Sequence, residues 1–215
     1  MIPARDLPGD VLEALTAPRA ALLGLTLDRP RLMGIVNVTP DSFSDGGAFF
    51  DAETAAAHAR ALTRDGADIL DIGGESTRPG SDTVAADEEI ARALPVIEAL
   101  GRGPAPVSVD TRKSRVARAA LDAGAAMLND VSALTHDPAM AAVAVSADVP
   151  ICLMHAQGEP KAMQVNPTYD DVLFDVYDHL AGRRDAALAA GIPRERIVLD
   201  PGIGFGKTLD HNLRL

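Results

Sequence analysis

The sequence LMGIVNVTPDSFSDGG, residues 32–47, joins a short apolar run to a polar loop rich in serine, aspartate, proline and glycine. The apolar part is bounded by turn residues and is too short for a helix, which is typical of a buried β-strand. The loop is built from turn formers, and an alanine-rich stretch with helical character follows at residues 52–64. Strand, loop and helix in this order set the pattern for the rest of the chain.

The same order recurs along the sequence. After residues 32–36, we expect buried strands at residues 69–72, 107–109, 126–128, 151–154 and 197–199. Between them we expect helices at residues 52–64, 87–100, 113–123 and 169–190, and one more that opens at Asp137-Pro138. Asp87 is the expected cap of the second of these helices, and Gly124 is the expected left-handed residue after the third.

Strands that alternate with helices predict a parallel sheet, which is either an open doubly wound sheet or a (β/α)8 barrel. The position of the polar residues favours the barrel, because every strand carries one at or just past its C-terminal end. These residues are Asn37, Asp71, Asp110, Asn129, His155 and Asp200. In a barrel all of them converge on one site, whereas an open sheet gathers only those near its switch point.

The predicted fold is therefore a TIM (β/α)8 barrel, of which this chain supplies about six of the eight βα units. Residues 1–30 show little periodicity, and we expect them to form a lead-in that caps the bottom of the barrel. Residues 31–215 form the barrel domain. Because such a barrel has eight strands and about 250 residues, we expect this domain to be incomplete at its C-terminal end.

Composition excludes several classes of function. The chain has 215 residues and a formal net charge of −11, which argues against a nucleic-acid partner. It contains no apolar run of about 18 residues, so we expect no membrane-spanning helix. Cys152 is the only cysteine, which excludes an intrachain disulfide, and the first residues lack the pattern of a signal peptide. A cytoplasmic location is expected.

Three further loops carry groups suited to ligand binding. DIGGESTRPGS (residues 71–81) combines hydroxyls with Arg78, whose planar fork matches a carboxylate or a phosphate. SVDTRK (residues 108–113) places a carboxylate at a strand end, where capping of the next helix is the simpler explanation. In LNDVS (residues 128–132), Asn129 offers both a donor and an acceptor, which suits the edge of a heterocycle.

The sixth strand ends in DPGIGFGKT, residues 200–208, which superficially suggests two nucleotide-binding motifs. Neither is present: Pro201 stands at the first glycine of a P-loop, and Lys207 at the last glycine of a Rossmann fingerprint. Among the other candidates, we expect His58 and His179 to be solvated or packed on helices. We expect His155 to be structural, although it could line the site, and Cys152 to be a small core residue.

From about residue 32 to residue 208, the chain resembles the dihydropteroate synthases. The loop at residues 33–47 is similar to the first loop of that family over fifteen successive positions, and residues 71–81 and 200–208 are similar to its second and sixth loops. The resemblance implies condensation of 6-hydroxymethyl-7,8-dihydropterin diphosphate with p-aminobenzoate. The products are 7,8-dihydropteroate and diphosphate, a step of folate biosynthesis.

The resemblance also implies roles for individual residues. Asp110, Asn129 and Asp200 are expected to bind the pterin, whose guanidine-like edge is complementary to two carboxylates and one amide. Met154 is expected to join them. Thr77, Arg78 and Pro79 are expected to meet p-aminobenzoate, with Phe205 as an apolar wall. Asn37 is expected to contribute to a site for Mg²⁺ and the diphosphate. These assigned residues are Asp110, Asn129, Asp200, Met154, Thr77, Arg78, Pro79, Phe205 and Asn37.

No tuned base or strong nucleophile is evident, so we hypothesise a dissociative reaction in which closure of the two mobile loops excludes water. In the family, sulfonamides compete for the p-aminobenzoate site, and the full-length protein is expected to be a homodimer. The family also has a Ser-Arg-Lys segment on its seventh strand and an Arg-x-His segment on its eighth. This sequence contains neither, so we expect a polypeptide ending at Leu215 to be inactive.

Two alternatives remain open from the sequence. One is a pterin-binding methyltransferase barrel, which would share the pocket of Asp110, Asn129 and Asp200 but would not be expected to carry the loops at residues 39–47 and 76–80. The other is a non-catalytic pterin-binding fragment.

Overall fold

The computed structural model describes residues 8–39, 52–76, 81, 83–158 and 163–215. Its strands are β1 Met33–Asn37, β2 Ile69–Gly73, β3 Val107–Asp110, β4 Met127–Asp130, β5 Ile151–Met154 and β6 Ile197–Asp200. Its helices are α1 Gly9–Thr16, α2 Ala52–Arg64, α3 Ala86–Leu100, α4 Ser114–Asp122, α5 Met140–Ala147, α6 Val172–Ala189 and α7 Leu209–Arg214, with the 3₁₀ turn η2 Arg194–Arg196 before β6.

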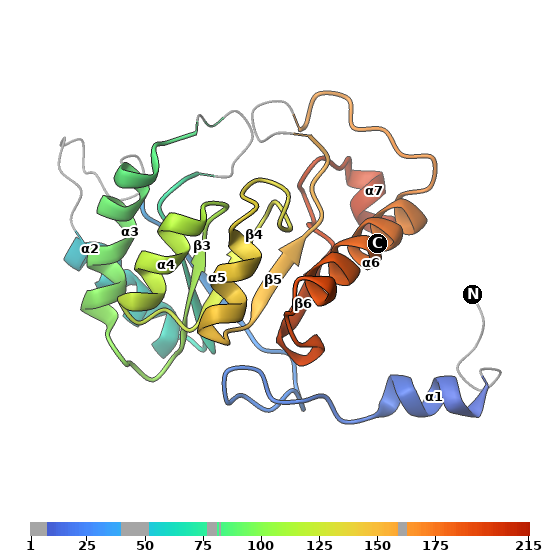
Figure 1. Ribbon diagram of the computed structural model, residues 1–215, viewed down its shortest axis with the longest axis horizontal. Helices are drawn as coiled ribbons and strands as arrows, with labels where there is room; N and C mark the ends of the chain where they lie inside the picture. Colours follow the sequence, from blue (N-terminus) through green and yellow to red (C-terminus); the bar gives the residue numbers. More distant parts are fainter. Residues whose placement is uncertain (1–7, 40–51, 77–80, 82, 159–162) are drawn as a thin grey trace.

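The six strands form one parallel sheet in the order β1-β2-β3-β4-β5-β6, and helices α2 to α6 cover its outer face (Figure 1). Each strand pairs with the next strand along the chain, as in the wall of a TIM barrel. The predicted fold class is confirmed for six βα units, with β1 and β6 as the first and last strands of the sheet. No described helix is both long and apolar enough to span a lipid bilayer.

The predicted elements are all present, with shifted ends. The strands β1, β3 and β6 extend to include the polar residues Asn37, Asp110 and Asp200, because these residues still pair with the neighbouring strand. Asp87 is not the cap of α3, as was predicted, but lies in its first turn. Likewise α5 begins at Met140 rather than at the predicted Asp137-Pro138.

The later start of α5 has a local cause. The side chain of Asp137 accepts hydrogen bonds from the backbone N–H groups of Ser114 (2.8 Å) and Ala139 (2.9 Å). The carboxylate therefore holds a turn between α4 and α5 instead of capping a helix that starts at the proline. At the end of α4, Gly124 has a φ of 115°, which confirms the left-handed conformation predicted there.

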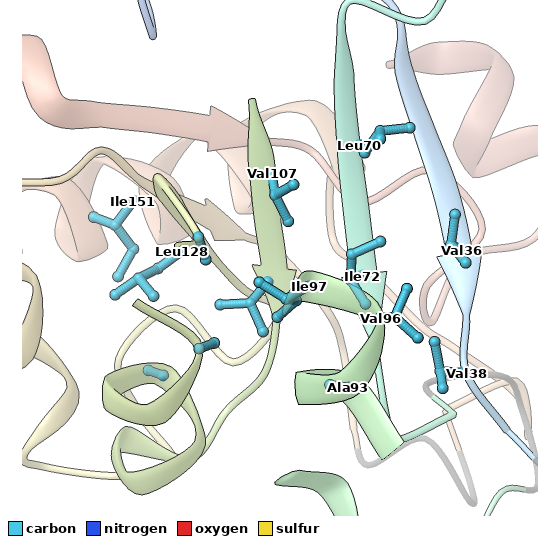
Figure 2. Close-up of a cluster of buried hydrophobic side chains, with 14 of the residues drawn as sticks. Val36, Val38, Leu70, Ile72, Ala93, Val96, Ile97, Val107, Leu128 and Ile151 are labelled. Carbon is cyan, nitrogen blue, oxygen red and sulfur yellow. The ribbon is translucent and has the colours of Figure 1, made fainter. Parts of the chain in front are cut away.

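The core lies between the outer face of the sheet and the helices. Figure 2 shows Val36 of β1 and Ile72 of β2 close to Val96 and Ile97 of α3, and all four side chains are at most 1 % exposed. Alanines in α2, α3 and α4 let the helices approach the strands closely. With the outer face committed to this core, the pleat directs the alternate residues of each strand to the inner face.

The N-terminal segment contains a helix that the sequence did not predict, α1, which lies apart from the sheet in Figure 1. Residues 17–32 continue from it toward the start of β1. Asp68, just before β2, binds the guanidinium of Arg29 (2.6 Å) and that of Arg31 (3.2 Å), and its second oxygen accepts the backbone N–H of Leu32 (2.9 Å). The role of residues 1–30 as a cap of the barrel, and the division at residue 31, remain predictions.

Candidate active site

Polar residues from neighbouring strands lie in one row at the C-terminal end of the sheet. The strand register pairs Asn37 with Gly73, Gly73 with Asp110, and Asp110 with Asn129. Side chains in register point to the same side of a parallel sheet. Gly73 leaves room within the row, since a Cβ atom there would lie 3.4 Å from Asp110 Oδ2 and 3.8 Å from Asn37 Oδ1.

Asp71, one pleat deeper on the same inner face, joins Asp110 and Asn129 in a cluster that we call the acidic pocket. Asn129 Nδ2 donates a hydrogen bond to Asp71 Oδ2 (2.9 Å). The other oxygen of Asp71 and the Oδ1 atom of Asp110 are both buried and have no hydrogen-bond partner among the described residues. Buried acceptors without donors are costly, so the pocket is suited to a ligand that supplies N–H groups.

The ionisation of the two carboxyl groups reflects this shortage of donors. Burial raises the pKa of Asp110 well above its usual range, and the negative charge of Asp71 raises it further. Burial also raises the pKa of Asp71, while hydrogen bonds from Ser108 and Asn129 oppose that rise. Asp110 is therefore the better site for a proton, and Asp71 is the better carboxylate.

Asp200 lies on the same inner face, two residues beyond the row. Its register partner is Met154, while Cys152, two residues earlier on β5, pairs with Asn129. Burial raises the pKa of the Cys152 thiol, and the charges of Asp200, Asp71 and Asp110 add to that rise. Cys152 is buried and is a core residue as predicted.

The loop after β6 is held rigidly against the end of β5. Lys207, which is 3 % exposed, lies 2.9 Å from His155 Nδ1 and donates to the carbonyl oxygens of Gly202 (2.9 Å) and Phe205 (3.1 Å). Gly202 has a φ of 66°, and a Cβ atom there would fall 1.9 Å from the carbonyl oxygen of His155. The loop can therefore pack only with glycine at this position, and its carbonyl groups turn inward around the ammonium.

His155 is the structural residue that we predicted, and its neighbours keep it neutral. Burial lowers its pKa to about 4, and the charge of Lys207 contributes to this shift. Burial similarly lowers the pKa of Lys207 to about 8. Because Nδ1 of the neutral ring accepts from the ammonium, the proton of the ring is on Nε2.

Two predicted site residues, Met154 and Phe205, line a cavity of about 100 Å³ at the ends of the later strands. Ser132, Arg112 and His179 also contribute to its wall. His179, which was expected to be packed on a helix, lies on α6 with its ring centroid 4.8 Å from that of His155. The structure thus places Met154, at the end of β5, and Phe205, in the loop after β6, on the wall of one cavity, and Met154 is also the register partner of Asp200.

The predicted p-aminobenzoate contacts Thr77, Arg78 and Pro79, and most of the first loop, lie outside the described residues. What the structure describes is the base of the second loop. Glu75 binds Arg112 NH2 (2.6 Å) and Lys113 Nζ, and it also accepts the backbone N–H of Val84 (3.0 Å). Lys113 Nζ also binds Glu89 of α3. We call Glu75, Glu89, Arg112 and Lys113 the ion-pair network.

Sequence reasoning assigned no role to Glu75 or Lys207, and it expected Asp71 at the end of a strand, whereas Asp71 lies within β2. A signal for Asp71 was available, because a carboxylate between Leu70 and Ile72 interrupts an otherwise apolar strand. The partners of Glu75 and Lys207 lie 37 and 52 residues away. No local sequence pattern indicates a pairing between residues so far apart in the chain.

The described geometry, with polar groups at the C-terminal ends of parallel strands and buried acceptors without donors among the described residues, is that of an α/β-barrel protein with a ligand site at this end. Comparison with known proteins gives the same class. Residues 33–215 match the family described as pterin binding enzyme. Dihydropteroate synthase from Neisseria meningitidis serogroup C is 51 % identical over 199 residues, which cover 92 % of this chain and 70 % of that protein. The Escherichia coli K12 enzyme is 46 % identical and is covered to 68 %.

Solved structures agree. The chain superposes on Xanthomonas albilineans dihydropteroate synthase with 4-aminobenzoic acid at a TM-score of 0.84 and 51 % identity, covering 93 % of this chain and 72 % of that one. For the Yersinia pestis enzyme in complex with a sulfonamide drug, the TM-score is 0.83 at 46 % identity, with 91 % and 72 % covered. The chain therefore belongs to the pterin-binding enzyme family and, within it, to the dihydropteroate synthases.

Proposed function

We propose that the protein condenses 6-hydroxymethyl-7,8-dihydropterin diphosphate with p-aminobenzoate to give 7,8-dihydropteroate and diphosphate. The observation that carries this proposal is the acidic pocket, where two buried carboxylate oxygens lack donors among the described residues of a dihydropteroate synthase chain. A pterin presents amino and ring N–H groups along one edge, and these groups would satisfy Asp110 Oδ1. Asp200 and Met154, further out on the same face, would contact the rest of the ring.

The proposed reaction needs little general acid or base catalysis from side chains. The bond between the methylene carbon and the diphosphate oxygen breaks, and its electron pair leaves with the diphosphate. The electron-rich pterin ring stabilises the cation that forms, the amine nitrogen of p-aminobenzoate attacks that carbon, and the amine proton is then lost. His155 is engaged by Lys207, which accords with a mechanism that relies on binding and orientation rather than on a general base.

Mg²⁺ is the metal that we propose for the diphosphate. Asn37 fits this role, because its amide oxygen is a hard ligand at the end of β1, in the same row as Asp110 with Gly73 between them. Mg²⁺ usually keeps several waters and binds through substrate phosphates with few protein ligands, so a single amide oxygen suffices for the protein's share. When bound, the metal would neutralise the departing diphosphate.

The p-aminobenzoate contacts remain a proposal. Phe205 supports it as an apolar wall of the cavity that Met154 also lines. Thr77, Arg78 and Pro79 are proposed to complete the subsite from the second loop, whose base is fixed by the ion-pair network. Occupancy by 4-aminobenzoic acid in the Xanthomonas albilineans enzyme, which is 51 % identical, supports this proposal.

Turnover and binding by the full-length protein test the proposal together. We expect dihydropteroate formation from the two substrates, and at least tenfold weaker pterin binding by an Asp200→Asn variant, because a charge-assisted hydrogen bond is lost. A Leu213→Ala variant, altered at an exposed side chain of α7, is the control and should retain both properties. Unchanged pterin affinity in Asp200→Asn would contradict the pterin assignment.

A homodimer and a cytoplasmic location are further proposals. Exposed apolar side chains of α6 and α7, among them Phe174 (65 %), Tyr177 (66 %) and Leu209 (75 %), support a protein–protein contact in this region. Light scattering of the full-length protein at micromolar concentration should give twice the monomer mass.

A further inference from the structure

Asp71 is a buried carboxylate that the proposed reaction does not use directly. It lies within β2, is 3 % exposed, and is 58 residues away in sequence from the amide whose hydrogen bond it accepts. Burying a carboxylate at such a position costs free energy compared with the apolar residue that would normally occupy it. Its hydrogen bond from Asn129 indicates what it contributes.

An ionised carboxylate can only accept hydrogen bonds. The amide group of Asn129 must therefore turn its nitrogen toward Asp71, which leaves its oxygen, Oδ1, directed away from Asp71. Without such a constraint, the two ends of an asparagine amide are nearly equal in size and can exchange places. Asp71 thus fixes the orientation of the amide of Asn129, the residue that faces the ligand.

Asp110 affects which of the two carboxyl groups carries the negative charge. It sits beside Asn129 in the strand register and shares the burial of Asp71, so the two carboxyl groups repel each other when both are charged. The hydrogen bond from Asn129 favours the charged form of Asp71, whereas Asp110 has no such partner among the described residues. Of the two carboxyl groups, the residue that orients the amide is therefore the better one to carry the charge.

We propose that Asp71 is a positioning residue that fixes Asn129 Oδ1 as a hydrogen-bond acceptor toward the ligand, and so selects rings that carry an amino group over rings that carry a carbonyl at the same place. This inference rests on the proposed function, because it concerns the same pterin pocket. It adds a determinant of specificity that does not itself touch the substrate.

The test compares two rings in three proteins. The ligands are 6-hydroxymethylpterin and the matched 2-oxo ring, 6-hydroxymethyllumazine, and the proteins are the wild type, Asp71→Asn and Ser108→Ala. An asparagine at position 71 can donate or accept, so both orientations of Asn129 become possible. We expect the preference for pterin over lumazine to fall by about tenfold to a hundredfold in Asp71→Asn, since a hydrogen bond to a charged group is worth that much.

Ser108→Ala is the control because it removes the other hydrogen-bonding group beside Asp71, which lowers the pKa of that carboxyl group, and leaves the hydrogen bond from Asn129 in place. Its ratio of dissociation constants should stay at the wild-type value. If Asp71→Asn weakens both ligands equally and keeps the wild-type ratio, Asp71 is only structural and the inference fails. If the wild type binds neither ring, the proposed function fails first.

A second measurement covers the case in which Asp71→Asn does not fold. In the wild type, the Asn129 side-chain amide protons should exchange slowly with solvent, because one of them is held by Asp71 in a buried site. Their NMR signals are assigned by their loss in Asn129→Asp. Exchange as fast as that of an exposed asparagine would overturn the inference.

Discussion

Two clusters of buried carboxylates lie at the ends of β2 and β3, and they differ in what surrounds them. In the ion-pair network, Glu75 and Glu89 meet the cations of Arg112 and Lys113. In the acidic pocket, the described neighbours of Asp71 and Asp110 include no cation, and Asp71 has the amide of Asn129 and the hydroxyl of Ser108 beside it. Burial raises the pKa of Glu75, but hydrogen bonds from Lys113, Val84 and Arg112 outweigh it and the net pKa is lowered. The pKa values of Asp71 and Asp110 are raised.

The direction of the side chains explains the difference. Asp71 and Asp110 point to the inner face, where the described residues supply few donors. The chain then passes so close to α3 that a Cβ atom at Gly74 would lie 2.7 Å from the carbonyl oxygen of Glu89. This approach brings Glu75 to the cations that follow β3. Carboxylates that are paired within the protein hold a loop in place, and those left without donors are suited to bind a ligand.

The largest effect is expected from breaking the ion-pair network. Lys113→Met removes the ammonium between Glu75 and Glu89 and leaves two buried carboxylates without it. We expect a loss of about 3–5 kcal/mol in the free energy of unfolding, the usual result of removing one partner from a buried pair. Urea denaturation measures it. The control is Arg115→Ala, whose pair with Asp87 is exposed, and which should cost less than about 1 kcal/mol.

A substitution in the acidic pocket should change the free energy of unfolding in the opposite direction. Asp110→Asn removes a buried carboxyl group whose charged form is disfavoured, so we expect stability to rise by about 1 kcal/mol near neutral pH. Thermal unfolding would show this as a higher midpoint. A clear destabilisation would mean that the carboxyl group of Asp110 is paired in the free protein, and the contrast between the clusters would be lost.

The two clusters should also differ in their dependence on pH. A raised pKa means that folded Asp110 holds a proton which the unfolded chain releases, so its contribution to stability falls as pH rises above the usual value of 3.8. The lowered pKa of Glu75 gives the opposite sign, with a contribution that is present above 4.5 and lost as the pH falls below it. Urea titrations between pH 3.5 and pH 7 should show the wild type losing stability relative to Asp110→Asn as the pH rises, and relative to Glu75→Gln as the pH falls.

The smallest expected effect concerns His155, whose ring should not take up a proton in the neutral pH range. With its pKa lowered to about 4, His155 should stay neutral from pH 5.5 to pH 8, whereas an exposed histidine titrates near 6.5. NMR of the imidazole resonances as a function of pH tests this. A midpoint near 6.5 for His155 would mean that Lys207 does not hold the ring.

The sequence predicted the parts of this molecule that depend on local pattern. Apolar runs located all six strands, and the polar residues that follow them located the site, because parallel strands bring their ends to one edge. The helix α1 escaped detection among several prolines, and Asp87 was assigned as a cap although it lies one residue inside the first turn. The contacts of Asp71, Glu75 and Lys207 arise only when distant strands are brought together by the fold.

Calorimetric titration of 6-hydroxymethyl-7,8-dihydropterin diphosphate into the wild type and Asp110→Asn tests the central claim most directly. The claim is that the carboxylates without protein donors form the pterin site. It predicts that Asp110→Asn stays folded and at least as stable as the wild type, yet binds the pterin about a hundredfold more weakly, equivalent to about 2.7 kcal/mol. Equal affinity in a folded Asp110→Asn variant would contradict it.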